Sequence, residues 1–132
     1  MDYLEDITEN TYTRIDPDEL EALMEYMYQA VVALEALEER IHKILLQARR
    51  DGRTETIEQA ELTLSQVESG KQWADVAAEP LEQMLSIMEN GEEVACEVSV
   101  LESLKRGCAA LENIVSLIKT KMQWIENDLK MV

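Results

Sequence analysis

The sequence predicts an all-α protein, an antiparallel bundle of three long helices with coiled-coil-like heptad packing. Apolar or small residues recur at alternating spacings of three and four along three long stretches, which is the pattern of a helix with one buried stripe. Phe is absent, so the core must consist of Leu, Ile, Val, Ala and Met, which suits helix packing. At 132 residues the chain can bury such a core as one domain without a disulfide, a metal or a cofactor.

The first helix is expected at about residues 16–51, after an acidic N-terminal arm at residues 1–15 that has no sustained period. Asp16 supplies an N-cap oxygen, Pro17 suits the first helical position, and Glu19 completes a capping box. The heptad stripe of this helix consists of Leu20, Leu23, Met27, Ala30, Leu34, Leu37, Ile41, Ile44 and Ala48.

The second helix is expected at about residues 55–89, although Gly70 and Pro80 fall inside it. Pro80 is a candidate break, because a proline ring clashes with the carbonyl four residues back at a cost of ~3 kcal/mol. The heptad phase crosses both residues without a shift, which favours one kinked helix. The alternative is a break at Pro80 that would give four helices. The stripe consists of Ile57, Ala60, Leu64, Val67, Lys71, Ala74, Ala78, Leu81, Leu85 and Met88.

The third helix is expected at about residues 92–130, after a turn at Asn90 and Gly91, so that the bundle spans residues 16–132. Gly107 lies inside this helix, where glycine lowers helix stability by about 1 kcal/mol relative to Ala and permits close approach of another helix. The stripe consists of Leu101, Leu104, Cys108, Leu111, Val115, Ile118, Met122, Ile125, Leu129 and Val132.

Apolar residues beyond these stripes predict self-association. The third helix carries a second stripe, displaced from the first around the helix, which consists of Ala110, Ile114, Leu117, Trp124 and Met131. The first helix adds Met24 and Val31, and Trp73 points away from the stripe of the second helix. Since homo-oligomers with twofold symmetry are common, we expect a homodimer that uses these residues, with contact to a different protein as the alternative.

The charge of the chain is strongly acidic, with 28 Asp and Glu against 12 Lys and Arg and a net charge of −16. This charge repels nucleic-acid phosphates and anionic membrane surfaces, so we expect direct binding to neither. An acidic ridge repeats every seven residues along the second helix at Glu61, Glu68, Asp75, Glu82 and Glu89. The ridge either solvates the edge of the bundle, with Asp75 near Lys105 and Glu61 near Lys119, or docks a protein with a basic surface.

The compartment expected from the sequence is the cytoplasm. The start of the chain, Met1 to Asp6, carries acidic residues and no basic one, unlike a secretory leader. Uncharged stretches are much shorter than the roughly 20 residues that cross a bilayer. Cys96 and Cys108 would lie about 18 Å apart on one helix, beyond disulfide reach, so we expect reduced thiols.

Residues capable of catalysis are few, and we expect a protein that is not an enzyme. Glu39 and His42 have the Glu-x-x-His spacing of di-iron bundles, but the heptad stripe turns them outward. The remote alternative is an all-α, metal-dependent nucleotide pyrophosphohydrolase, whose magnesium-binding carboxylates would need to share a cleft. The candidate carboxylates for that activity are Glu35, Glu38, Glu39, Glu92 and Glu93. Cys108 occupies a core position without a nearby base, so it is expected to be a small buried side chain.

The function expected from these patterns is protein–protein interaction. The leading hypothesis is an acidic helical-bundle module that acts as an adaptor, chaperone or inhibitor of a partner protein. The alternative is an acidic inhibitor that mimics nucleic acid and blocks the basic groove of a nuclease or nucleic-acid-binding complex. In composition, though in no motif, the chain resembles small acidic inhibitors of phage and bacterial conflict systems, including anti-CRISPR and nuclease-immunity proteins.

Overall fold

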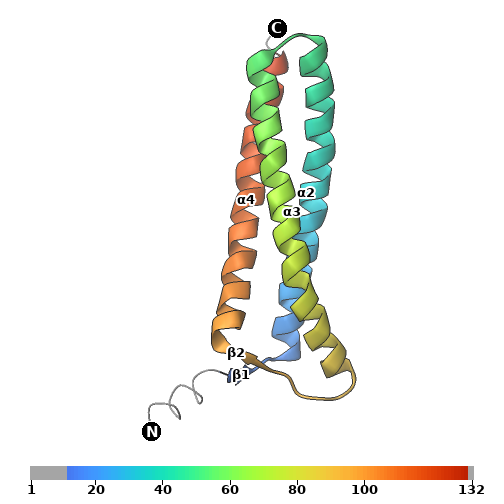
Figure 1. Cartoon of the computed structure of the whole chain (residues 1–132), viewed down its shortest axis with the longest axis vertical. Coiled ribbons are helices and arrows are strands. Elements are labelled where there is room, and N and C mark those ends of the chain that lie inside the picture. Colours follow the sequence, from blue (N-terminus) through green and yellow to red (C-terminus); the bar gives the residue numbers. More distant parts are fainter. Residues whose placement is uncertain (1–11, 131–132) are drawn as a thin grey trace.

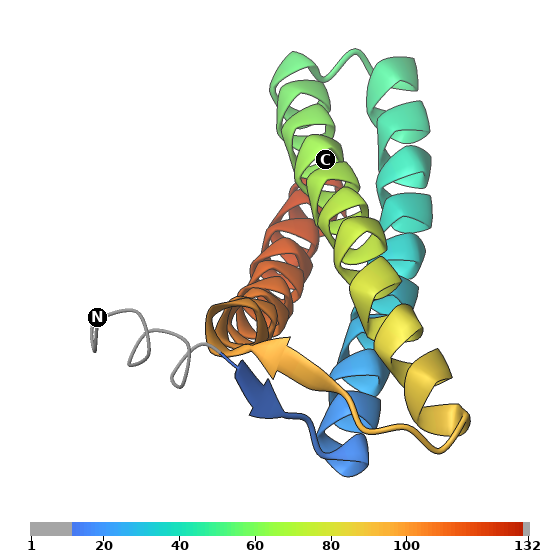
Figure 2. The same cartoon turned by 60° about the horizontal axis from the view of Figure 1, so that its bottom comes forward.

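The computed structural model describes residues 12–130, which form three long helices packed against one another and a two-stranded sheet (Figure 1). The elements in chain order are β1 (Tyr12–Arg14), α2 (Pro17–Arg50), α3 (Thr54–Glu89), β2 (Ala95–Glu97) and α4 (Val98–Lys130). In Figure 1, α2 runs away from the sheet, α3 returns toward it, and α4 runs away from it again. Figure 2 shows the sheet lying across one end of the three helices. The predicted all-α class agrees with this mostly helical chain.

Helix α2 begins as its sequence indicates. Asp16 is the N-cap, and its Oδ1 accepts a hydrogen bond from the Asp18 backbone N–H at 3.1 Å. Pro17 fills the first helical position, where its missing N–H has no helical partner to lose. At the other end, Gly52 adopts a φ of +69°, the left-handed conformation that lets the chain turn into α3. Glu19 does not complete the expected capping box but forms an ion pair with Lys105 of α4.

Helix α3 continues through Pro80, so the four-helix alternative is wrong. Ala77 and Leu81 are buried on either side of the proline. Their packing favours a continuous helix, since tertiary contacts offset the hydrogen bond that proline cannot donate. The helix ends at Glu89, and Gly91 turns the chain with a φ of +82°.

The buried face of α3 is rotated relative to the predicted stripe. Half of its buried positions lie outside that stripe and hold small residues, namely Thr56, Thr63, Gly70 and Ala77. The neighbours expected there, Ile57, Leu64, Lys71 and Ala78, are only half-buried. A hypothetical Cβ on Gly70 would stand 3.2 Å from Leu34 Cδ1 and 3.3 Å from Leu111 Cδ1. The small side chains therefore let α2 and α4 approach α3 closely, and this approach sets its rotation.

The sheet was not predicted, and it corrects two boundaries. Helix α4 begins at Val98 rather than Glu92, because the preceding residues form β2, which pairs antiparallel with β1. Thr13 is the register partner of Cys96, and the Ile15 backbone N–H donates to the Val94 carbonyl at 3.1 Å. The last residues of the expected N-terminal arm are thus part of the fold, whereas residues 1–11 lie outside the described part of the chain.

The core runs along the axis between the three helices. The predicted stripe of α4 is buried from Leu101 to Ile125, and the α2 stripe is buried except for half-buried Leu23 and Ala30. The largest fully buried side chains are Leu20, Leu34, Ile41, Leu81, Ile118, Met122, Val67 and Thr63. Each helix between residues 12 and 130 also carries many charges, and none is apolar over a length that would cross a bilayer.

Candidate functional site

A surface groove follows the line between α3 and α4. It begins as a hollow of about 430 Å³ beside Trp73 and Gly107 and continues past Leu117 to Trp124. Adjoining hollows share Gln66 and Ile114, so the depression is continuous. We call it the α3–α4 groove, lined by Ser65, Gln66, Ser69, Gly70 and Trp73 from α3 and by Gly107, Ala110, Leu111, Ile114, Leu117, Ile118, Thr120, Lys121 and Trp124 from α4.

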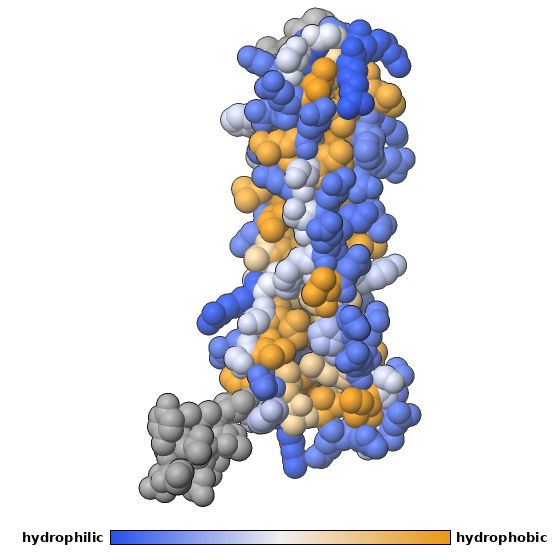
Figure 3. Space-filling view, viewed as in Figure 1, coloured by the Kyte–Doolittle hydropathy of each residue, from blue (hydrophilic) through white to orange (hydrophobic). Residues whose placement is uncertain are grey.

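The two walls of the α3–α4 groove differ in chemistry. The α3 wall presents small and polar side chains such as Ser65 and Ser69, which leave space open beside the helix. The α4 wall is mostly apolar, with Thr120 and Lys121 as its polar members. Its Leu117 and Trp124 side chains are 67% and 76% exposed. Figure 3 shows apolar surface along the left edge of the molecule, where Figure 1 places α4. Large apolar side chains gathered at the surface are typical of interaction sites.

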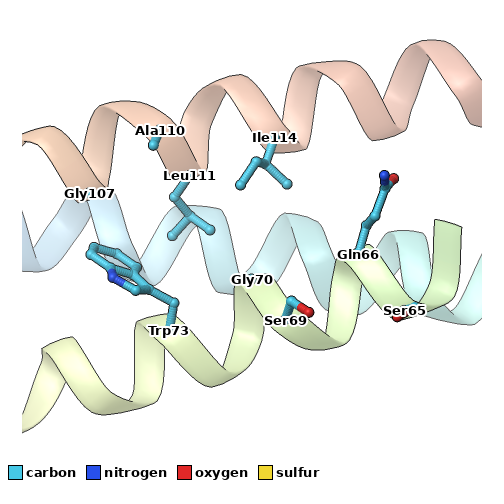
Figure 4. Close-up of a pocket in the computed structure, with 9 residues that line it drawn as sticks. All are labelled: Ser65, Gln66, Ser69, Gly70, Trp73, Gly107, Ala110, Leu111 and Ile114. Atoms are coloured by element: carbon cyan, nitrogen blue, oxygen red, sulfur yellow. The ribbon is translucent and has the colours of Figure 1, made fainter. Parts of the chain in front are cut away.

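One end of the groove is closed by contact between Trp73 and Gly107. Figure 4 shows the Trp73 indole reaching from α3 toward the α4 backbone at Gly107. A Cβ at Gly107 would lie 2.9 Å from Trp73 Cε2 and still closer to two other ring atoms. Any side chain at this position would therefore overlap the ring packed against it. The sequence indicated a close approach at Gly107, but not that Trp73 makes it.

The predicted apolar interface residues divide between two grooves. Four of the five on the third helix lie together along the α3–α4 groove: Ala110, Ile114, Leu117 and Trp124. Met131 lies outside the described residues. Met24 and Val31 lie instead on the other side of α3, in a hollow of about 210 Å³. We call this hollow the α2–α3 groove, lined by Met24, Met27, Tyr28 and Val31 from α2 and by Ala74, Asp75, Ala78, Leu81 and Glu82 from α3.

The acidic ridge of α3 is exposed along its whole length, at Glu61, Glu68, Asp75, Glu82 and Glu89. The ion pairs predicted for it are wrong, because Glu61 pairs with Arg49 of α2 at 3.4 Å and Lys105 pairs with Glu19. The rotation of α3 explains the difference, since Asp75 and Glu82 border α2 rather than α4. Between residues 12 and 130, the other four acids of the ridge form no ion pair.

Other carboxylates hold neighbouring helices together. Lys71, expected within the buried stripe of α3, reaches the edge of the core, where its Nζ lies 3.3 Å from Glu38 Oε2 of α2. Arg40 of α2 donates two hydrogen bonds to Glu126 of α4. Such partly exposed pairs stabilise a protein by about 1 kcal/mol or less, so they orient the helices more than they stabilise them.

The structure does not bring the candidate catalytic carboxylates together. Glu38 pairs with Lys71 partway along α2, whereas Glu93 pairs with Arg14 beside the sheet. His42 is exposed, and the nearby Glu39 lies 3.8 Å from Lys43 Nζ. Across residues 12–130, no group of three His, Cys, Asp or Glu side chains is arranged to hold a metal ion.

Both cysteines are buried and free, on different elements. Cys108 lies on α4 as predicted, but Cys96 lies on β2 rather than on a helix. Burial raises the pKa of both thiols, and the neighbouring Glu97 charge raises the pKa of Cys96 further. The neutral thiol is thus the favoured form of each cysteine in the folded chain.

We expect both thiols to react slowly with dithiobis-nitrobenzoate at pH 8 in native buffer and rapidly in denaturant, because the reactive thiolate is scarce and shielded. Since each folded pKa exceeds the unfolded value of about 8.5, the protonated thiol stabilises the fold below that pH. This contribution is lost as the pH rises through the folded pKa. The free energy of unfolding should therefore fall more above pH ~8.5 in the natural chain than in a C96A/C108A variant. Equal thiol reactivity in folded and unfolded protein would contradict this expectation.

Comparisons with known proteins do not assign the chain to a family or a function. No protein-family profile, curated protein or solved structure matches the chain. Its function must therefore be inferred from its own residues and their geometry.

Proposed function

We propose that this protein is a non-enzymatic interaction module that forms a homodimer through its α3–α4 groove. The observation that carries the proposal is the exposure of the large apolar side chains of Leu117 and Trp124 on the α4 wall of this groove. Removing two such side chains from water on each copy would contribute several kcal/mol, by the usual value for burying a large apolar side chain. A twofold arrangement would place the exposed side chains of each copy in the groove of the other.

Charge also favours this face for self-association. Two copies with a net charge of −16 repel each other, so their contact should avoid the most acidic surface. Residues 98–130 carry five basic and four acidic residues, whereas residues 54–89 carry one basic and eight acidic residues. The α3 wall of the groove contributes uncharged Ser65, Gln66 and Ser69. The α3–α4 groove therefore has an apolar surface and a small net charge.

A dimer of this kind would leave the acidic ridge available for a second protein. In this role the module would act as an adaptor, chaperone or inhibitor in the cytoplasm, built on antiparallel helices with coiled-coil-like heptad packing. Burial at alternating spacings of three and four, along α4 and in α2 from Leu34 to Ala48, supports that packing. A second candidate, the acidic inhibitor that occupies a basic groove, is favoured by the exposure of the ridge.

Light scattering on a sizing column tests the dimer. We expect a mass near twice the 15.1 kDa of one chain in both low and high salt. Leu117→Asp should convert the protein to a monomer, because it places a charge in the apolar contact. Leu46→Asp is the matched control, since Leu46 is 61% exposed on α2 outside the groove. A monomer in the natural chain, or an L117D variant that stays dimeric, would overturn the proposal.

A further inference from the structure

The α2–α3 groove is also built to contact another chain, but its chemistry differs from that of the α3–α4 groove. On α2, Met24, Tyr28, Val31 and Glu35 follow one another at helical spacing and so share one face. Met24 and Val31 are half-buried, while Tyr28 is 66% exposed at the border of the groove. Methionine adapts its shape to irregular partners, so this apolar floor suits a side chain that inserts from outside.

The second observation is that the border of the α2–α3 groove is acidic. Asp75 and Glu82 line the groove directly from α3. Residues 21–35 and 72–89, the helical segments from which the groove is built, contain seven acidic residues and no Lys or Arg. In the described part of the chain, none of the acids in these two segments forms an ion pair. Such a border complements positive charge on a partner.

We propose that the α2–α3 groove binds a basic amphipathic helix of a partner protein. This inference rests on the proposed function as an interaction module, and it names the class of partner. The stripe from Met24 to Glu35 is about 16 Å long at 1.5 Å per residue, which matches about three turns of a helix lying along it. Apolar side chains of the partner would enter the floor at helical spacing, and flanking Lys or Arg would face Asp75 and Glu82.

The occupant is expected to differ between the two grooves because their borders differ. The α3 wall of the α3–α4 groove is uncharged, so it offers a basic helix no complementary charge. The α2–α3 groove would repel the acidic surface of a second copy of this chain, since its own border is acidic. Of these two grooves, the α2–α3 groove is the one that combines apolar contact with acidic charge.

The test uses a fluorescent helical peptide of about 16 residues, with Leu along one face and Lys or Arg on the others. Fluorescence anisotropy should show saturable binding to the full-length chain. A second peptide, in which Ser replaces each Leu, keeps the charge and should bind at least about tenfold more weakly. Equal binding of the two peptides would overturn the inference and favour the acidic ridge acting by charge alone.

Variants of the chain locate the binding site. D75K/E82K should weaken peptide binding by about tenfold or more, because it reverses the charge of the border. D51K/E58K is the matched control, since it changes the net charge equally at two exposed positions near the other end of α3. Equal weakening by the two variants would show that net charge alone attracts the peptide and would overturn the inference.

A third variant tests the apolar contribution without disturbing the core. Tyr28→Ser removes an exposed ring at the border of the groove, so folding should be preserved while peptide binding falls several-fold. Unchanged binding would contradict an apolar contact at this groove. The dimer is measured separately by light scattering, so the two proposals fail separately. A dimer that binds no peptide overturns the inference alone, whereas a monomer that binds peptide overturns the dimer alone.

Discussion

Leu34→Ala is expected to lower the free energy of unfolding by about 3–5 kcal/mol. Leu34 is fully buried, and its Cδ1 packs over Gly70 of α3 at the level where Leu111 of α4 meets the same glycine. All three helices therefore depend on this side chain for close packing. Truncation would leave a cavity that the surrounding helices cannot fill without moving together, and an unfilled cavity adds to the lost burial of the methyl groups.

Urea unfolding followed by circular dichroism at a fixed protein concentration would measure the effect. A fixed concentration is needed because the proposed dimer would add a concentration-dependent term to the apparent stability. Leu46→Ala is the matched control on the same helix, where the side chain is exposed and the change should be about 0.5 kcal/mol or less. A loss at Leu34 no larger than the loss at Leu46 would show that the three helices do not meet at Gly70.

The effect of Gly107→Ala on the free energy of unfolding is expected to change sign with the residue at position 73. In the natural chain the new methyl group would overlap the Trp73 indole, and overpacking of this kind costs about 1–3 kcal/mol. In a Trp73→Ala background the ring is absent, so the higher helix propensity of Ala should stabilise the fold by about 0.5–1 kcal/mol. Four proteins (the natural chain, the two single variants and the double variant) form a cycle that isolates this interaction.

The cycle is read from the same urea unfolding measurement. If the effects of the two substitutions on the free energy of unfolding were additive, Trp73 would not pack against Gly107 in solution. A stabilising G107A in the natural chain would mean that the indole turns aside at little cost. The W73A variant alone also reports on the α3–α4 groove, because it opens the end that the indole closes.

Apolar periodicity predicted α2 and α4 well but placed α3 at the wrong rotation. In α4 the large residues at heptad positions are also the buried ones, from Leu101 to Ile125. In α3 the large residues Ile57 and Leu64 compete with the small residues Thr56 and Thr63 for the same side of the helix. Apolar periodicity predicts that Ile57 and Leu64 are buried, whereas close packing of the helices buries Thr56 and Thr63. The predicted partners of Asp75 and Glu61 were wrong for the same reason.

The sheet could have been recognised from a period of two. Val94 and Cys96 are buried and alternate with exposed Ala95, and Val98 and Val100 continue the alternation in the sequence. β-Branched residues at alternate positions are typical of a strand. The expected helix covers this segment because it starts directly after the turn at Gly91, although its apolar stripe begins only at Leu101. The groove was only partly predictable, since the second stripe of α4 was visible in the sequence but the space left by Ser65 and Ser69 was not.

The pairing of β1 with β2 also bears on the order in which the chain assembles. Tyr12 and Glu97 are 85 residues apart in the sequence, yet they face each other in the sheet. Helices α2 and α3 are joined by a short turn at Gly52, so their mutual contacts require little loop closure. Entropy of closure grows with loop length, and contacts between distant segments slow folding. We therefore expect the α2–α3 hairpin to form early and α4 to dock late. The α3–α4 groove, where a second copy is proposed to bind, would then lie on the side of the molecule that is completed last.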